Sequence, residues 1–167
     1  SGLPKDFRKQ GGATLLNQSI KSGRDLAVMA QILRDPRFET FRIFYTQQQR
    51  IVHHTAITSR LPGAIYLEKI GHDKHDLGVL LDNTKHQVRA DGYWVLHNHP
   101  SGNAEPSYQD VQLTVYMASC VSGFKGHVVI NTNEYSVIDK YGEVDHVHDM
   151  GNQAGGYKIN PFKNHEL

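Results

Sequence analysis

The chain lacks most of the features that would assign it to a specialised class of protein. Its 167 residues include one cysteine, Cys120, which excludes an internal disulfide framework and favours a reducing compartment, so we expect a cytoplasmic protein. No apolar run exceeds five residues, which predicts neither a membrane-spanning helix nor the core of a signal peptide. Its 18 Lys and Arg residues balance 17 Asp and Glu residues, so no overall field attracts nucleic acid or anionic membrane.

The order of the patterned segments predicts one domain with a mixed sheet. A chain of 167 residues is long enough for one substantial core. Helical spacing of apolar residues predicts helices over about 25–35, 76–90 and 107–122. Alternating or compact apolar runs predict strands at 38–46, 51–58, 92–99, 126–132 and 135–139. This order is typical of an α/β (α+β) domain, in which helices pack on a mixed central sheet.

The two ends of the chain have weaker patterns than its middle. Residues 1–23 are rich in Gly and Lys, and we expect them to be loosely structured. Residues 24–142 are expected to form the domain. Residues 143–167 are polar and are expected to form a tail that wraps the surface or is disordered.

Periodicity also predicts which side chains face the core. Alternation along the first strand places Glu39, Phe41, Ile43 and Tyr45 on one face. Helical spacing predicts a core-facing row in each of three helices. The rows are Leu26, Met29, Ala30 and Leu33 in the first, Leu77, Leu80, Leu81, Thr84 and Val88 in the second, and Val111, Val115, Ala118 and Val121 in the third.

The stretch HNHPSGNAEPSYQD, residues 97–110, concentrates residues that bind metals. His97 and His99 end an apolar strand and point to the same side, about 7 Å apart along the chain. Asp110 lies in the first turn of the following helix, from which its carboxylate can reach the end of the strand. Two neutral imidazoles and one carboxylate leave a fourth tetrahedral position for water, which is the open arrangement of a catalytic zinc site.

A purely structural interpretation exists for part of this stretch. Ser107 followed by Asp110 is typical of a capping box, in which both side chains satisfy backbone N–H groups at the start of a helix. That interpretation does not account for His97 and His99, because burying two imidazoles without partners costs free energy. The metal site is therefore the favoured hypothesis.

The spacing His-x-His-Pro, six residues, Ser-x-x-Asp resembles the signature of the JAB/MPN-plus (JAMM) zinc metalloproteases. The form HNHPSG…PS..D resembles the RadC-like branch of that superfamily, and the similarity extends from about Glu39 to Asp139. The resemblance implies a single JAB/MPN-like domain with Zn²⁺ bound by His97, His99 and Asp110.

The resemblance also implies roles for two further residues. By its position in the first hairpin, Glu39 corresponds to the family's general base, which takes a proton from water and delivers it to the leaving amine. The rival glutamate is Glu68, which lies in an irregular segment without a strand to orient it. Ser107 corresponds to the serine that helps to stabilise the oxyanion, a role compatible with capping the helix.

The resemblance implies a zinc-dependent metallopeptidase or isopeptidase acting on a protein or peptide, and it extends the candidate substrates to those with a ubiquitin-like tail. The alternative is a RadC-like nucleic-acid-associated module in DNA repair, mobile-element transfer or anti-restriction. That alternative calls for clustered Lys and Arg, whereas the basic residues here are scattered among equally many acids. A third possibility, a scaffold without metal, is disfavoured by the intact ligand set.

The remaining candidates give weaker signals. The sequence DHVHD at 145–149 repeats the His-x-His spacing but lies in the polar tail, and HDKH at 72–75 lies in an expected loop. His53 and His54 point to opposite faces of their strand, so at most one of them can approach the site. Cys120 lies among apolar helix positions and is expected to be an inert core residue.

Overall fold

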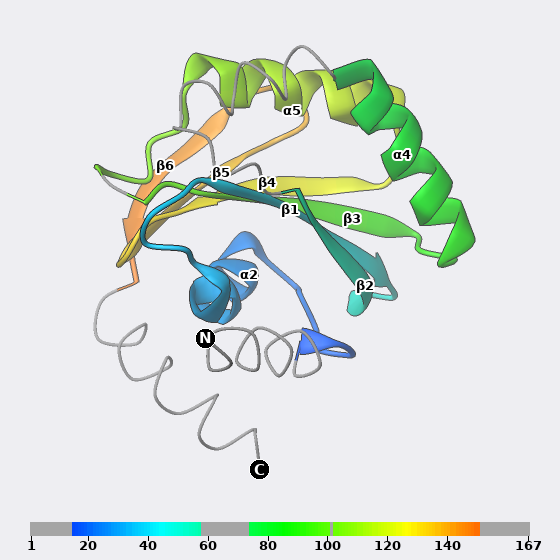
Figure 1. Ribbon diagram of the computed structural model, residues 1–167, viewed down its shortest axis with the longest axis horizontal. Helices are drawn as coiled ribbons and strands as arrows, with labels where there is room; N and C mark the ends of the chain where they lie inside the picture. Colours follow the sequence, from blue (N-terminus) through cyan, green and yellow to red (C-terminus); the bar gives the residue numbers. More distant parts are fainter. Residues whose placement is uncertain (1–14, 58–73, 101, 151–167) are drawn as a thin grey trace.

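A computed structural model describes residues 15–57, 74–100 and 102–150 of the protein. It contains a six-stranded sheet with helices on both faces (Figure 1). The order across the sheet is β2-β1-β3-β4-β5-β6, with β3 and β4 parallel and the other neighbours antiparallel. This mixed sheet confirms the predicted fold class. The strands are β1 (Thr40–Gln47), β2 (Arg50–Ile57), β3 (Gly92–Asn98), β4 (Phe124–Ile130), β5 (Glu134–Ile138) and β6 (Val144–Asp149).

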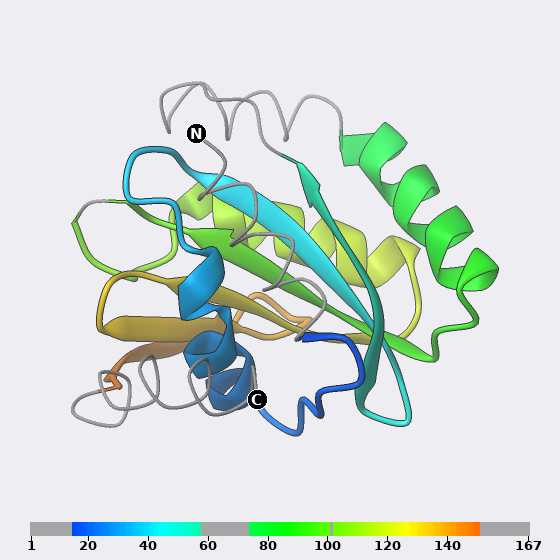
Figure 2. The same cartoon turned by 60° about the horizontal axis from the view of Figure 1, so that its bottom comes forward.

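The helices cover both faces of the sheet (Figures 1 and 2). Helices α4 (Lys74–Gln87) and α5 (Tyr108–Cys120) lie on one face, and α2 (Gly23–Met29) with the 3₁₀ turn η1 (Ala30–Leu33) lies on the other. Helix α2 begins where the Ser22 side chain accepts a hydrogen bond from the Asp25 backbone N–H. In the described parts of the chain, no helix is long and apolar enough to cross a membrane.

Each face of the sheet has its own hydrophobic core, as the alternation of strand residues requires. The predicted row of α2 and η1 is buried in the first core. The buried strand residues of that core are Phe44, Ile51, Trp94, Leu96, Val128, Ile130 and Tyr135. In the second core, under α4 and α5, the strand residues are Phe41, Ile43, Tyr45, Tyr93 and Val95. The predicted shared face of the first strand is therefore confirmed for its three apolar members.

The predicted core-facing rows of the two later helices need correction. In α4, Leu77 and Leu81 are buried as predicted, but Leu80 is 56% exposed. In the predicted row of α5, Val121 is buried as predicted, but Val115 is 38% exposed, and the buried apolar residues within the helix are Leu113 and Met117. The buried face of α5 also includes the polar residues Asp110 and Thr114, so the spacing of apolar residues alone does not identify this face.

Residues expected to be loose or to form a tail also contribute to the fold. Leu15 and Ile20 are buried, and backbone hydrogen bonds join Asn17 and Gln18 to Ile51 in β2. The first residues of the expected tail form β6, which pairs with β5. Most of the β6 side chains are at least partly exposed, so this edge strand depends on backbone pairing and carries no apolar pattern.

Candidate metal centre

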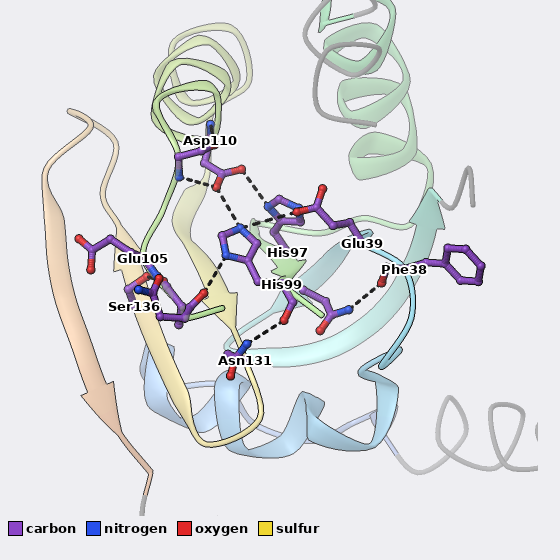
Figure 3. Close-up of polar contacts among 12 residues, drawn as sticks. Phe38, Glu39, His97, His99, Glu105, Asp110, Asn131 and Ser136 are labelled. Atoms are coloured by element: carbon purple, nitrogen blue, oxygen red, sulfur yellow. Dashed lines mark hydrogen bonds and ion pairs between the residues drawn. The ribbon is translucent and has the colours of Figure 1, made fainter. Parts of the chain in front are cut away.

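His97 lies in strand β3 and His99 directly follows this strand, so both histidines of the motif lie at the same end of the sheet (Figure 3). His97 is fully buried and lies on the face covered by α5. His99 follows the last strand residue, and its backbone N–H donates to the Ile130 carbonyl in β4 over 2.9 Å. The two imidazole rings meet edge to face, with centroids 4.9 Å apart.

The start of α5 holds Asp110 against these rings. A capping box is present, because Ser107 Oγ accepts from the Asp110 N–H at 3.1 Å and Asp110 Oδ2 accepts from the Ser107 N–H at 2.9 Å. The Asp110 side chain is 1% exposed, with Oδ1 2.8 Å from His97 Nδ1 and Oδ2 3.5 Å from His99 Nε2. The capping interpretation is therefore correct for the helix start, and the same carboxylate also contacts both histidines.

Glu39 reaches the histidines from the other side (Figure 3). It directly precedes β1, whose first residue, Thr40, pairs with Asn98 of β3. The Glu39 Oε1 atom lies 3.6 Å from His97 Nε2 and 3.9 Å from His99 Nε2. The structure thus brings the expected base to the expected ligands, whereas its rival, Glu68, lies outside the described residues.

His97 and Asp110 form a buried pair in which each residue stabilises the charged form of the other. Burial disfavours the protonated form of His97, but the Asp110 carboxylate, aided by Glu39, outweighs this and raises the pKa of His97 to about 9. Burial likewise disfavours the charged form of Asp110, yet the attraction of His97 and a hydrogen bond to it hold the pKa of Asp110 far below its usual range. Asp110 is therefore ionised at neutral pH, as a metal-binding carboxylate must be.

His99 provides the test of whether a cation fits this site. Its Nδ1 atom lies 3.0 Å from the Asn103 carbonyl oxygen, which can only accept, so Nδ1 carries a proton. In a neutral ring, Nε2 then carries a lone pair, and it faces oxygens of both Glu39 and Asp110. These electron-rich atoms face one another and could act together as ligands of a metal cation. Imidazole nitrogens and carboxylate oxygens are ligands that suit zinc.

The ligand atoms form two overlapping groups within the described residues. One group contains Glu39, His97 and His99, and the other contains His97, Asp110 and His127. Within each group, one ligand atom from every residue lies within 4.8 Å of the others. The predicted set of His97, His99 and Asp110 draws on both groups, with His97 as their shared member.

His127 is a buried neighbour of the site that the sequence analysis missed. Thr114 Oγ1 has one proton and donates it to the Asp110 carbonyl at 2.6 Å, so His127 Nδ1, 2.7 Å from Oγ1, must be a donor. Burial lowers the pKa of His127 to about 3, against the attraction of Asp110, so the ring is neutral. The spacing of Asp110 and Thr114 by four residues was a usable signal, because it places both on one helical face.

The two histidines of the expected tail, His146 and His148, each pair with a carboxylate at the surface. His146 Nδ1 lies 3.0 Å from a Glu105 oxygen, and His148 Nε2 lies 2.8 Å from an Asp145 oxygen. All four side chains are at least 43% exposed. Among the residues that the structure describes, none of them belongs to a group that could hold a metal ion.

The other weak candidates lie away from the metal ligands or outside the described residues. His53 packs on Tyr45 and His54 on Phe44, in agreement with their predicted opposite faces. Of the stretch 72–75, residues 72 and 73 lie outside the described residues. The prediction for Cys120 was wrong in one respect, because this cysteine is exposed at the end of α5.

Comparison with known families identifies the domain that carries this site. Residues 76–141 match the family model described as the RadC-like JAB domain. The match runs from α4 through both histidines and Asp110 to the turn after β5, and Glu39 precedes it. Among curated proteins, none matches the chain. Residues 76–141, which include both histidines and Asp110, therefore match a RadC-like JAB domain of the JAB/MPN superfamily.

Proposed function

We propose that the protein is a zinc-dependent metallopeptidase or isopeptidase, within the hydrolase-like functions that its JAB domain suggests. The observation that supports this best is the position of His99 Nε2. Its tautomer is fixed by Asn103, and it faces oxygens of Glu39 and Asp110 at 3.9 and 3.5 Å. The His99 and Glu39 side chains are 13% and 10% exposed, compared with 1% for Asp110, so this side of the site is the less deeply buried one.

His97, His99 and Asp110 would hold the zinc ion. The carboxylate of Asp110 is buried and ionised, and its hydrogen bond from the Ser107 backbone orients it toward the histidines. When bound, zinc would supply Lewis acidity, which polarises a scissile carbonyl and lowers the pKa of water.

Glu39 would move the proton during hydrolysis. Its carboxylate can accept a proton from the attacking water, whose oxygen forms a bond to the carbonyl carbon. The same carboxyl can then give this proton to the amide nitrogen as the C–N bond breaks, which leaves a carboxylic acid and an amine. Its place beside both histidines, on the less deeply buried side of the site, suits this exchange with water and substrate.

Ser107 would stabilise the oxygen that becomes negative during attack. Its Oγ atom accepts from the Asp110 backbone N–H, so its own hydroxyl proton remains available for donation. The side chain is half-buried at the start of α5, next to the Asp110 ligand. One neutral donor of this kind adds to the charge stabilisation that the metal provides.

The proposed substrate is a protein or peptide, and the resemblance to JAMM proteases extends this to ubiquitin-like tails. A first experiment needs no substrate and measures the metal content of purified protein by elemental analysis. Wild type should hold about one zinc per chain, as a single site of this type does. His99→Ala and Asp110→Asn should lose it, whereas His146→Ala, which changes a surface histidine, should not.

A second experiment tests hydrolysis with a panel of peptides and of ubiquitin-like fusion proteins. Cleavage should stop when a chelator removes the metal and return when zinc is added. Wild type that contains no zinc, or zinc that stays bound when His99 is replaced, would contradict the proposed metal centre. A zinc-loaded protein that cleaves no member of the panel would contradict the proposed reaction.

A further inference from the structure

Asn98 lies between the two histidines of the motif but points to the opposite face of β3. Its side chain is 1% exposed and lies on the side of the sheet that α2 and η1 cover. There, Nδ2 donates two hydrogen bonds, to the Asp35 carbonyl at 2.8 Å and to the Phe38 carbonyl at 2.9 Å. Figure 3 labels Phe38, and a dashed line marks the hydrogen bond that its carbonyl accepts.

The segment that Asn98 holds is the one that carries Glu39. The antiparallel ladder between β1 and β3 ends at the pair Thr40 and Asn98, so Glu39 lies just outside it. Residues 35–38 form a turn in which Asp35 Oδ1 accepts from the backbone N–H groups of Arg37 and Phe38. The two bonds from Asn98 connect this turn to the strand that carries the histidines.

We propose that Asn98 is a positioning residue for the general base. This inference rests on the proposed role of Glu39. By donating both amide protons to the turn before Glu39, Asn98 fixes the distance between that carboxylate and the histidines. Residues 97–99 thus place both histidine side chains on one face, while the Asn98 side chain on the opposite face holds the turn that precedes Glu39.

The buried amide oxygen of Asn98 supports a specific role for this side chain. Among the described residues, Asn98 Oδ1 has no hydrogen-bond partner, although it is buried. A buried acceptor without a partner costs free energy, and an apolar residue would avoid that cost beside Leu96 and Ile130. The two donated bonds are the contribution that an apolar residue cannot replace.

Hydrogen exchange tests the contact without a substrate or a metal. In the wild-type protein, the Nδ2 protons of Asn98 should exchange at least about tenfold more slowly than those of Asn83, which is exposed on α4. In Asn98→Leu, the Arg37 and Phe38 amides should exchange about tenfold faster while the β3 amides stay protected. Asn98→Ser should act in the same direction.

Asn131→Leu is the matched control. Asn131 is also a buried asparagine that donates through Nδ2, but its bond goes to the His99 carbonyl at 3.0 Å. Its replacement should leave exchange in residues 35–40 unchanged. If every amide exchanges faster in Asn98→Leu, the role of Asn98 is general stability and the inference is overturned.

A double-mutant cycle tests the effect on catalysis, using the peptide that the wild-type protein cleaves fastest. Asn98→Leu should retain zinc and lower kcat about 10- to 100-fold, because a small misplacement of a catalytic group has effects of this size. In a Glu39→Gln background it should have no further effect. An additive loss, or a loss of zinc, would overturn the inference, whereas inactive wild type would refute only the proposed function and leave the exchange test valid.

Discussion

Replacement of Asp110 by Asn should abolish the high pKa of His97 in the metal-free protein. The two side chains are 2.8 Å apart, and Asp110 is the main reason that the pKa of His97 rises from 6.5 to about 9 despite burial. That difference corresponds to about 3 kcal/mol at 1.36 kcal/mol for each pH unit. No discount for solvent screening is needed, because the His97 side chain is 0% exposed.

The sign of the pH effect follows from the direction of this shift. A pKa raised by folding means that the protonated form of His97 stabilises the native state fully below about pH 6.5. The contribution is then lost as pH rises toward about 9. The metal-free wild type should therefore lose up to about 3 kcal/mol of unfolding free energy from this pair over that interval, and Asp110→Asn should not.

The assay combines two measurements on metal-free protein. NMR titration of the His97 ring should give a pKa of about 9 in wild type and, in Asp110→Asn, a pKa near the ordinary value of about 6.5, because burial is then opposed by Glu39 without Asp110. Urea unfolding at pH 6.5 and 9 gives the free energies. Asp82→Asn, which removes the exposed carboxylate near His86, is the control and should retain the wild-type slope. A His97 pKa that stays above 8 in Asp110→Asn would refute the reasoning.

Three other substitutions test separate parts of the site. Glu39→Gln should retain zinc and lower kcat by roughly two to four orders of magnitude, the size of a general acid–base contribution. Asp110→Asn should lose both the zinc and the activity. Elemental analysis and kinetics on one preparation of each variant measure the two properties. Thr114→Val leaves the buried N–H of His127 without its acceptor and should cost about 1–3 kcal/mol in urea unfolding. Thr114→Ser, the control, keeps the hydroxyl and should cost about 1 kcal/mol for the lost methyl group, and a loss in Thr114→Val no larger than this would contradict a stabilising role of the hydroxyl. Cys120→Ser should change stability by less than about 0.5 kcal/mol, because the thiol is exposed; a larger loss would show a packing role.

The sequence was sufficient wherever a property depends on residues close together in the chain. Strand alternation predicted that His97 and His99 share a side, and helix-capping chemistry predicted the reciprocal bonds of Ser107 and Asp110. The shared face of the first strand followed from the same alternation, and the helices and strands themselves followed from local periodicity. Such features depend on backbone geometry over a few residues, so they can be predicted without the fold.

Other features depend on which segments meet in space, and only the tertiary structure decided them. His127 approaches Asp110 because β4 lies parallel to β3, an arrangement that no local pattern specifies. The buried face of α5 includes Asp110 and Thr114, so its apolar periodicity pointed to Val115 instead. Asn98 had no local signal at all, since its partners lie about 60 residues earlier in the chain. Long-range pairing selects among faces and partners that the local sequence leaves equivalent, and for that reason the surroundings of the metal ligands could be assigned only from the structure.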